Sequence, residues 1–127
     1  MQTMKITRRE FEELVRQALE EVPDEFLPYL ENLAVEIEDM PSARDCQEAE
    51  IDDPRWLLGL YHGTPLTQQS VEQPYQWPER ISIYRKNIQR VCRTRREIVD
   101  QIRTTVLHEI GHHFGLDEDD LEELGYD

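Results

Sequence analysis

Two histidines, His108 and His112, lie four residues apart in the sequence, and Glu109 directly follows the first. An α-helix turns about 100° per residue, so side chains four positions apart project from the same face, one turn above the other. Two imidazoles in this arrangement can bind one zinc ion, which acidifies a water molecule, and an adjacent carboxylate can accept the proton of that water. The spacing therefore predicts metal-assisted hydrolysis, with His108 and His112 as zinc ligands and Glu109 as the general base.

The residues around the motif predict the helix that carries it. Apolar residues recur every four positions, and two more widen the stripe; they are Ile98, Ile102, Val106, Ile110 and Phe114, with Val99 and Leu107. On a helical wheel, His108 and His112 lie roughly 150° from the centre of this stripe. One side of the helix can therefore pack while the other binds a metal. The competing interpretation, two histidines on a solvated helix face, is less favoured because Glu109 and Gly115 accompany them.

Hydrophobic patterns predict the remaining elements. A capping-box pattern at residues 7–10 precedes an amphipathic helix that continues until Pro23, and residues 23–32 suggest a short second helix. Alternating apolar residues predict strands, in three segments: 33–37, 56–61 and 81–84. The segments 40–54 and 68–78 are interpreted as loops, the second long enough to act as a flap. Helices, then strands, then a long helix indicate the α+β class.

Length and composition limit the class of protein. The 127 residues predict one domain spanning 1–127, and the sequence has no run of about 20 apolar residues that could cross a bilayer. The formal charge of −14 argues against a nucleic-acid partner, because phosphates would be repelled. The first residues are charged and lack an apolar signal core, so we expect a cytoplasmic protein. Cys46 and Cys92 are far apart, and we expect reduced thiols.

The charged residues are unevenly distributed. Eight of the fourteen basic residues lie between Arg80 and Arg103, while residues 117–127 contain seven acids and no base. One interpretation is that these residues form solvated surfaces whose charges attract one another across the fold. The other is a basic rim that orients an acidic peptide beside the metal.

With these features, the chain resembles the zincin metallopeptidases, in particular the small bacterial zincin-like metallopeptidases called mini-zincins. The resemblance covers most of the chain, including residues 57–66, 81–85 and 108–124. It implies a minimal zincin-like fold, in which a small twisted mixed sheet of about three to four strands lies beside an active-site helix and an N-terminal helix.

The resemblance also implies roles for individual residues. His108 and His112 match the metal ligands, Glu109 matches the general base, and Gly115 matches the turn that ends the helix so that a third ligand can return to the metal. Glu118 stands at the position of that third ligand, where relatives have His or Asp. Carboxylates do bind zinc, and Asp117 or Asp119 could substitute if the turn shifts register.

Zincins hold an extended peptide along an edge strand beside the metal. By resemblance, residues Ile81, Ser82, Ile83 and Tyr84 are the candidate edge strand, with an ordinary core strand as the alternative. Metzincins have a methionine beneath the metal, but no methionine follows the motif in this sequence. We expect Tyr126 to fold back under the metal instead, and the alternative is a terminal tyrosine that takes no part in the site. A peptidase must also stabilise the negative charge that develops on the carbonyl oxygen of its substrate. The candidate hydrogen-bond donors to this oxyanion are Tyr126, His62 and Tyr61.

Two functions therefore remain. The first is a zinc-dependent metallopeptidase that acts on a peptide or protein, with neither nucleic acid nor membrane as partner. The alternative is a catalytically weak or inactive zincin-derived module that binds or regulates a protein. Retention of Glu109 favours the enzyme, because a structural zinc site has no need of a carboxylate beside its ligand. Whether the protein forms a homodimer stays open.

Overall fold

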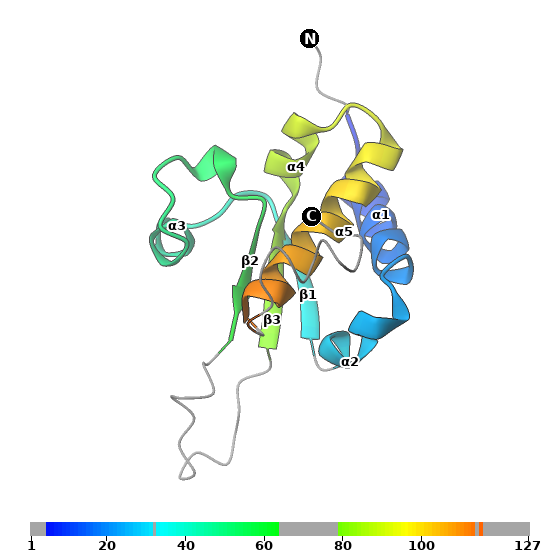
Figure 1. Cartoon of the computed structure of the whole chain (residues 1–127). Coiled ribbons are helices and arrows are strands. Elements are labelled where there is room, and N and C mark those ends of the chain that lie inside the picture. The colour runs from blue at the N-terminus through cyan, green and yellow to red at the C-terminus, as the bar shows by residue number, and fades with distance from the viewer. Residues whose placement is uncertain (1–4, 32, 64–78, 114, 116–127) are drawn as a thin grey trace.

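The computed structural model describes residues 5–31, 33–63, 79–113 and 115, which form helices packed on a small sheet (Figure 1). The elements, in chain order, are α1 (Arg8–Glu20), η1 (Asp24–Phe26), α2 (Leu27–Leu30), β1 (Leu33–Glu38), α3 (Ala43–Glu48), η2 (Pro54–Trp56), β2 (Gly59–His62), β3 (Glu79–Tyr84), α4 (Arg85–Val91) and α5 (Arg95–His113). The predicted α+β class is confirmed.

The described strands form one mixed sheet in the order β1-β3-β2. β3 pairs in parallel with β1 and antiparallel with β2, so that Ile81 lies between Val35 and Tyr61. The small mixed sheet predicted from the family resemblance is therefore confirmed. The edge-strand assignment is wrong, because β3 is the central strand and its backbone pairs on both sides. This correction applies to each residue assigned to that edge: Ile81, Ser82, Ile83 and Tyr84.

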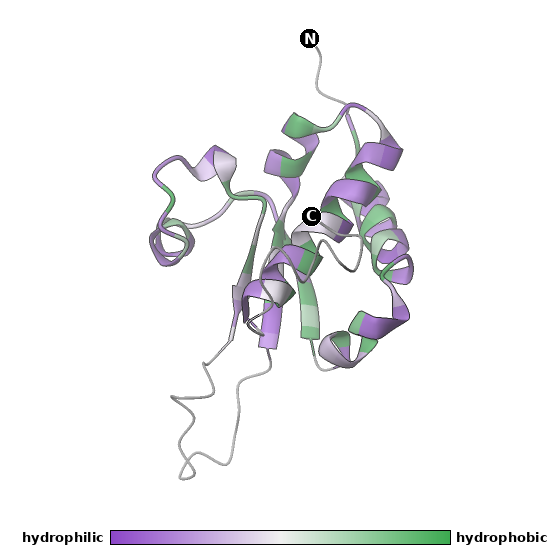
Figure 2. Ribbon diagram, in the orientation of Figure 1, coloured by the Kyte–Doolittle hydropathy of each residue, from purple (hydrophilic) through white to green (hydrophobic). Residues whose placement is uncertain are grey.

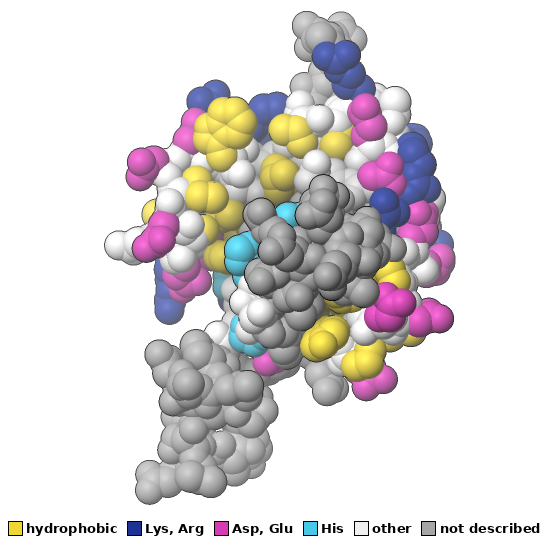
Figure 3. Space-filling view, viewed as in Figure 1, with side chains coloured by type: hydrophobic (Ala, Val, Ile, Leu, Met, Phe, Trp, Pro, Cys, Tyr) yellow, Lys and Arg dark blue, Asp and Glu magenta, His cyan; other side chains and the backbone are white. Residues whose placement is uncertain are grey.

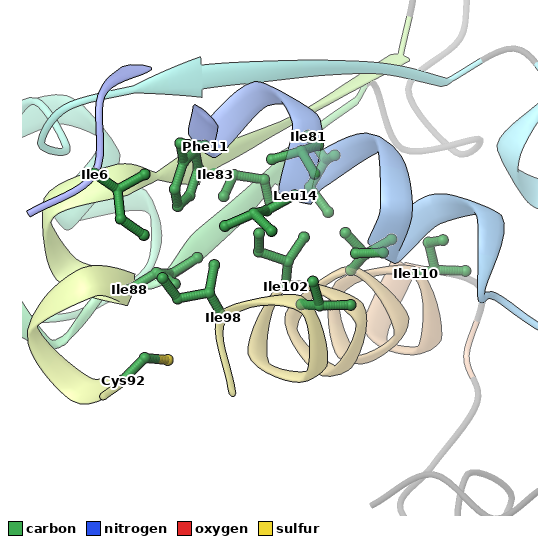
Figure 4. Close-up of a cluster of buried hydrophobic side chains, with 14 residues drawn as sticks. Ile6, Phe11, Leu14, Ile81, Ile83, Ile88, Cys92, Ile98, Ile102 and Ile110 are labelled. Carbon is green, nitrogen blue, oxygen red and sulfur yellow. The ribbon is translucent and has the colours of Figure 1, made fainter. Parts of the chain in front are cut away.

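The main core lies between one face of the sheet and the helices α1 and α5. Phe11 and Leu14 from α1, Ile83 from β3, and Ile102 and Ile110 from α5 point toward one another there (Figure 4). The predicted stripe on the motif helix is buried as far as the structure describes it, because each of its members from residue 98 to 110 is at most 1% exposed. Packing, rather than helix propensity, holds α5 in place.

The opposite face of β3 is also covered. Successive side chains of a strand point to opposite faces, so Ser82 and Tyr84 face away from Ile81 and Ile83. Tyr84 packs with Leu57 and Leu60 in a second cluster, and its hydroxyl donates a hydrogen bond of 2.8 Å to Asp45 of α3. All four residues of segment 81–84 are consequently fully buried. Figure 2 shows hydrophilic and hydrophobic residues alternating along the helices, as expected for helices with one buried side.

Both long helices have identifiable ends. The Thr7 hydroxyl caps α1 by accepting a hydrogen bond of 3.1 Å from the amide of Glu10, as the sequence predicts. At the far end of α5, Gly115 has a φ of 75°, a left-handed conformation that glycine adopts without a Cβ penalty. Its amide lies 3.4 Å from the carbonyl oxygen of His112. The predicted helix end is confirmed.

Three segments differ from the sequence interpretation. The predicted loop 40–54 contains α3, which begins with a capping box between Ser42 and Asp45. The predicted strand 56–61 begins only at Gly59, and Trp56 instead lies in η2 with 70% of its surface exposed. Between β3 and the motif helix, residues 85–91 form α4, for which the sequence patterns predict no element. Short helices are difficult to predict from hydrophobic periodicity, because one or two turns contain too few residues to show a repeating pattern.

Many of the arginines in the basic segment are paired with acids from elsewhere in the chain. Arg96 and Arg103 both bind Glu21 at the end of α1, and Arg85 binds Asp39 after β1. These pairs favour the interpretation of charges that attract one another across the fold. Separately, no helix among the described residues is long and apolar enough to span a membrane. Cys46 and Cys92 are free and buried, and burial raises the pKa of Cys92 to about 11.

Candidate active site

The three residues of the predicted hydrolytic centre lie on the last two turns of α5. His108 and Glu109 are partly buried, whereas His112 is exposed. Histidine side chains are visible on the face of the molecule along which α5 runs (Figure 3). The end of the motif helix therefore combines a packed side with an accessible side, as the helical wheel predicts.

Glu109 is in contact with β2. Its carboxylate oxygen Oε2 accepts a hydrogen bond of 3.2 Å from the backbone amide of Tyr61. The amide of Tyr84 donates a hydrogen bond to the carbonyl oxygen of Leu58. In an antiparallel pair of strands, residues whose backbone groups face the partner strand alternate with residues whose backbone groups face away from it, so Leu58 and Tyr61, three positions apart, face opposite ways. The amide of Tyr61 must then point away from β3, toward the outer edge of β2. The proposed general base thus lies against an edge of the described sheet.

A glycine permits this close approach of α5 to β2. A Cβ added to Gly59 would lie 2.6 Å from Cγ2 of Thr105 on α5 and 3.1 Å from the carbonyl oxygen of Ser82. Both separations are shorter than ordinary van der Waals contacts. Gly59 is therefore required for α5 to pack directly against this strand.

Burial raises the pKa of Glu109 above the usual value for a glutamate. The hydrogen bond from the Tyr61 amide and the charges of the nearby histidines His112, His108 and His62 act in the opposite direction, but burial is the larger effect. A carboxylate with a raised pKa holds a proton more readily, which suits a group that must accept a proton and then donate it.

His113 connects the end of α5 to two strands. Its ring stacks on that of Tyr61 with centroids 4.0 Å apart, and its Nε2 lies 3.7 Å from a carboxylate oxygen of Glu79. His113 therefore packs against the sheet at the end of α5. Burial, and then the neighbouring Glu79, raise the pKa of the Tyr61 phenol, which therefore stays protonated.

Several predicted site residues lie outside the described part of the chain. They are the proposed third ligand Glu118 with its alternatives Asp117 and Asp119, the proposed floor residue Tyr126, and the proposed flap 68–78. The described residues bring together Glu109 and Tyr61, while His62, another candidate oxyanion donor, forms a hydrogen bond of 3.0 Å with Ser82.

One group of polar residues escaped sequence reasoning. Asp45, Glu48 and His62 each offer a ligand atom, and these atoms all lie within 4.8 Å of one another. Asp45 and Glu48 belong to the segment that the sequence predicts to be a loop, and the sequence suggests His62 only as an oxyanion donor. The spacing of Ser42 and Asp45 is the capping-box signal that could have revealed α3, but nothing local connects α3 with β2.

The donor set on α5 fits zinc chemically. Imidazole nitrogen and carboxylate oxygen are common zinc ligands, and catalytic zinc sites combine such ligands with an open position. His108 and His112 supply two imidazoles from successive turns of one helix, and Glu109 supplies a carboxylate that is not needed as a ligand. Cys46 and Cys92 are buried and stand apart from this set in the sequence.

Comparison with known families decides the class of this chain. Residues 30–126 match the zincin-like metallopeptidase family. The chain belongs to this family. The match includes β1 to β3 and the whole of α5, so the elements that form the site are the ones that the family shares.

A solved structure shows the same fold for a second protein. The chain is similar to a conserved hypothetical protein from T. thermophilus, with a TM-score of 0.54 and 27% sequence identity. The similarity covers 86% of this chain and 94% of the other. None of the curated proteins searched matches the chain.

Proposed function

We propose that this protein is a zinc-dependent metallopeptidase that hydrolyses peptide bonds at the end of α5. The observation that carries the proposal is the contact between Glu109 and the amide of Tyr61. It brings a partly buried carboxylate from the histidine-bearing helix to the outer edge of a strand, where an extended peptide could bind. Membership of the zincin-like metallopeptidase family supports the same reaction class.

His108 and His112 would hold the zinc ion, with Glu118 as the proposed third ligand and Asp117 or Asp119 as alternatives. When bound, zinc lowers the pKa of a water molecule and polarises a carbonyl group. The carboxylate of Glu109 would accept the proton of the attacking water and transfer it to the nitrogen of the leaving amine. The raised pKa of Glu109 supports this role, because it favours the protonated form between the two transfers.

We propose that the substrate binds along β2 rather than β3. The backbone groups of Gly59 and the carbonyl of Tyr61 point away from β3, so they are oriented to pair with an added strand, whereas the amide of Tyr61 is bonded to Glu109. This edge is also the one that Glu109 contacts. Main-chain pairing would hold an extended peptide beside the motif helix without requiring a particular sequence.

The composition of the chain also supports inferences about its location, domain organisation and partners. We infer a cytoplasmic protein of one domain, 1–127, that acts on a peptide or protein and has neither nucleic acid nor membrane as partner. The charge of −14 supports the exclusion of nucleic acid. A homodimer is compatible with this proposal and can be tested by measuring the mass of the protein in solution.

The decisive comparison is between the wild type and Glu109→Gln. Both proteins are loaded with zinc, their metal content is measured, and a broad peptide library is incubated with each and analysed by mass spectrometry. We expect equal zinc content, cleavage by the wild type, and a rate at least about 100-fold lower for Glu109→Gln, because general base catalysis contributes roughly 10²–10⁴-fold.

The control is Glu12→Gln, which removes an exposed acid paired with Arg8 on α1 and should cleave as the wild type does. Equal cleavage by the wild type and Glu109→Gln would contradict the proposal. Zinc binding without cleavage by the wild type would instead support the non-catalytic binding or regulatory module.

A further inference from the structure

A second cluster of metal-binding side chains lies on the other side of β2 from the core. Asp45 and Glu48 come from α3, which lies beside β2 in Figure 1, and His62 comes from the end of β2. The three surround part of a pocket of about 370 Å³ that Arg44 and Arg80 also line. Because side chains alternate along a strand, the side chains of His62 and Tyr61 point to opposite faces of β2, and the cluster lies on the face turned away from α5.

The ring of His62 is already held in a position suited to binding a cation. Its Nε2 lies 3.0 Å from Oγ of Ser82, whose side chain is fully buried, and only 14% of the His62 side chain is exposed. A cation at Nδ1 requires the ring proton on Nε2, where Ser82 can accept it. Metal-binding histidines commonly donate their second ring nitrogen to an oxygen in this way.

The two carboxylates are held nearby. Oδ2 of Asp45 accepts hydrogen bonds from the hydroxyl of Tyr84 at 2.8 Å and from the amide of Ser42 at 3.3 Å. Oε2 of Glu48 lies 3.9 Å from Nδ1 of His62. Ligands of a divalent cation bound at about 2.0–2.4 Å are separated by roughly 3–5 Å. The three donors therefore need only small movements to bind one ion.

The arginines that line the pocket have acidic partners of their own. Nε of Arg44 binds Oε1 of Glu48, the oxygen that does not face His62, and Arg80 binds Glu36 on β1. A carboxylate can accept from an arginine at one oxygen while its second oxygen binds a metal. The two acids and the imidazole thus remain able to bind a cation between them.

We propose that Asp45, Glu48 and His62 form a second site for a divalent cation of the first transition row, such as Zn²⁺. One imidazole with two carboxylates suits such ions better than Mg²⁺ or Ca²⁺, which favour oxygen ligands alone. This site uses none of the zinc ligands of the proposed peptidase centre. The three ligands come from α3 and β2, so a bound ion would link α3 to β2, the strand whose outer edge is the proposed substrate-binding edge.

The test uses the full chain with the histidines of α5 removed. In a His108→Ala/His112→Ala background, Zn²⁺ is titrated calorimetrically, and the same titration is repeated after adding Glu48→Gln or Glu12→Gln. Glu48 and Glu12 are comparably exposed glutamates, each paired with an arginine of its own helix. We expect one Zn²⁺ equivalent in the background, binding at least about 10-fold weaker with Glu48→Gln, and no change with Glu12→Gln.

Three outcomes would overturn the proposal: no Zn²⁺ binding in the background, equal affinity with Glu48→Gln, or equal weakening by Glu12→Gln. A His62→Ala variant in the same background, with circular dichroism to verify its folding, checks the imidazole separately and should also lose the site. The result is distinct from a failure of the peptidase proposal, which would instead appear as a wild type that binds only one Zn²⁺ and retains it when His108 and His112 are replaced.

Discussion

Tyr61 contacts the motif helix twice, through its backbone and through its ring. Its amide donates to Glu109, and its ring stacks on His113. The motif itself could be predicted from sequence because its ligands are four residues apart on one helix, so local geometry alone fixes their relation. The partner of Glu109 could not be predicted, because 48 residues separate it from Tyr61 and only the folded sheet brings the two together.

The stack between Tyr61 and His113 should stabilise the end of α5. Replacing His113 with Ala removes the ring, and we expect the free energy of unfolding in urea to fall by about 1 kcal/mol, which is typical of an aromatic pair. His113→Phe keeps a ring that can stack and should retain most of that stability. Wild-type stability in His113→Ala would show that the contact contributes nothing.

At the scale of elements, the strands and both long helices could be predicted from their hydrophobic periods, but the order of the strands could not. Residues 81–84 alternate like a strand with one buried face, yet β3 is covered on both faces because Tyr84 has its own cluster on the side of α3. The alternation of apolar and polar residues indicates that a segment forms a strand, but it does not indicate which strands lie on either side of it. For this reason the sequence predicts a sheet edge at β3, which is in fact the central strand.

The packing of α5 on β2 depends on Gly59. We expect Gly59→Ala to destabilise the protein by about 1–3 kcal/mol, because the new methyl group would collide with Cγ2 of Thr105 and with the backbone at Ser82. Thr105→Ser removes the colliding methyl group but keeps the hydroxyl that accepts a hydrogen bond from Gln101. The double variant should recover part of the loss in chemical denaturation, and additive effects of the two substitutions would contradict this explanation.

For the whole molecule, ion pairs between distant segments should make stability depend on pH. The hydrogen bond from Arg96, with a further contribution from Arg103, lowers the pKa of Glu21 below its usual value. A carboxylate whose pKa is lower in the folded protein than in the unfolded chain adds stability above the unfolded pKa of about 4. That contribution is lost as the pH falls through the folded pKa.

We therefore expect thermal stability to decline as the pH is lowered from about 5 toward 2, and Glu21→Gln to make that decline less steep. The control is Glu20→Gln, because Glu20 pairs with Arg16 within α1 and does not connect helices. The measurement is the melting temperature across this pH range at low ionic strength, where exposed ion pairs are least screened. Identical pH profiles for the wild type and Glu21→Gln would contradict a contribution from this cluster.

The central claim is that His108 and His112 together hold a zinc ion beside Glu109. Crystals of the zinc-loaded protein, with diffraction recorded on both sides of the zinc absorption edge, would locate each bound ion by its anomalous scattering. The account predicts a peak within about 2.0–2.1 Å of one ring nitrogen from each histidine. Fully occupied zinc elsewhere, with no peak between these two imidazoles, would contradict it.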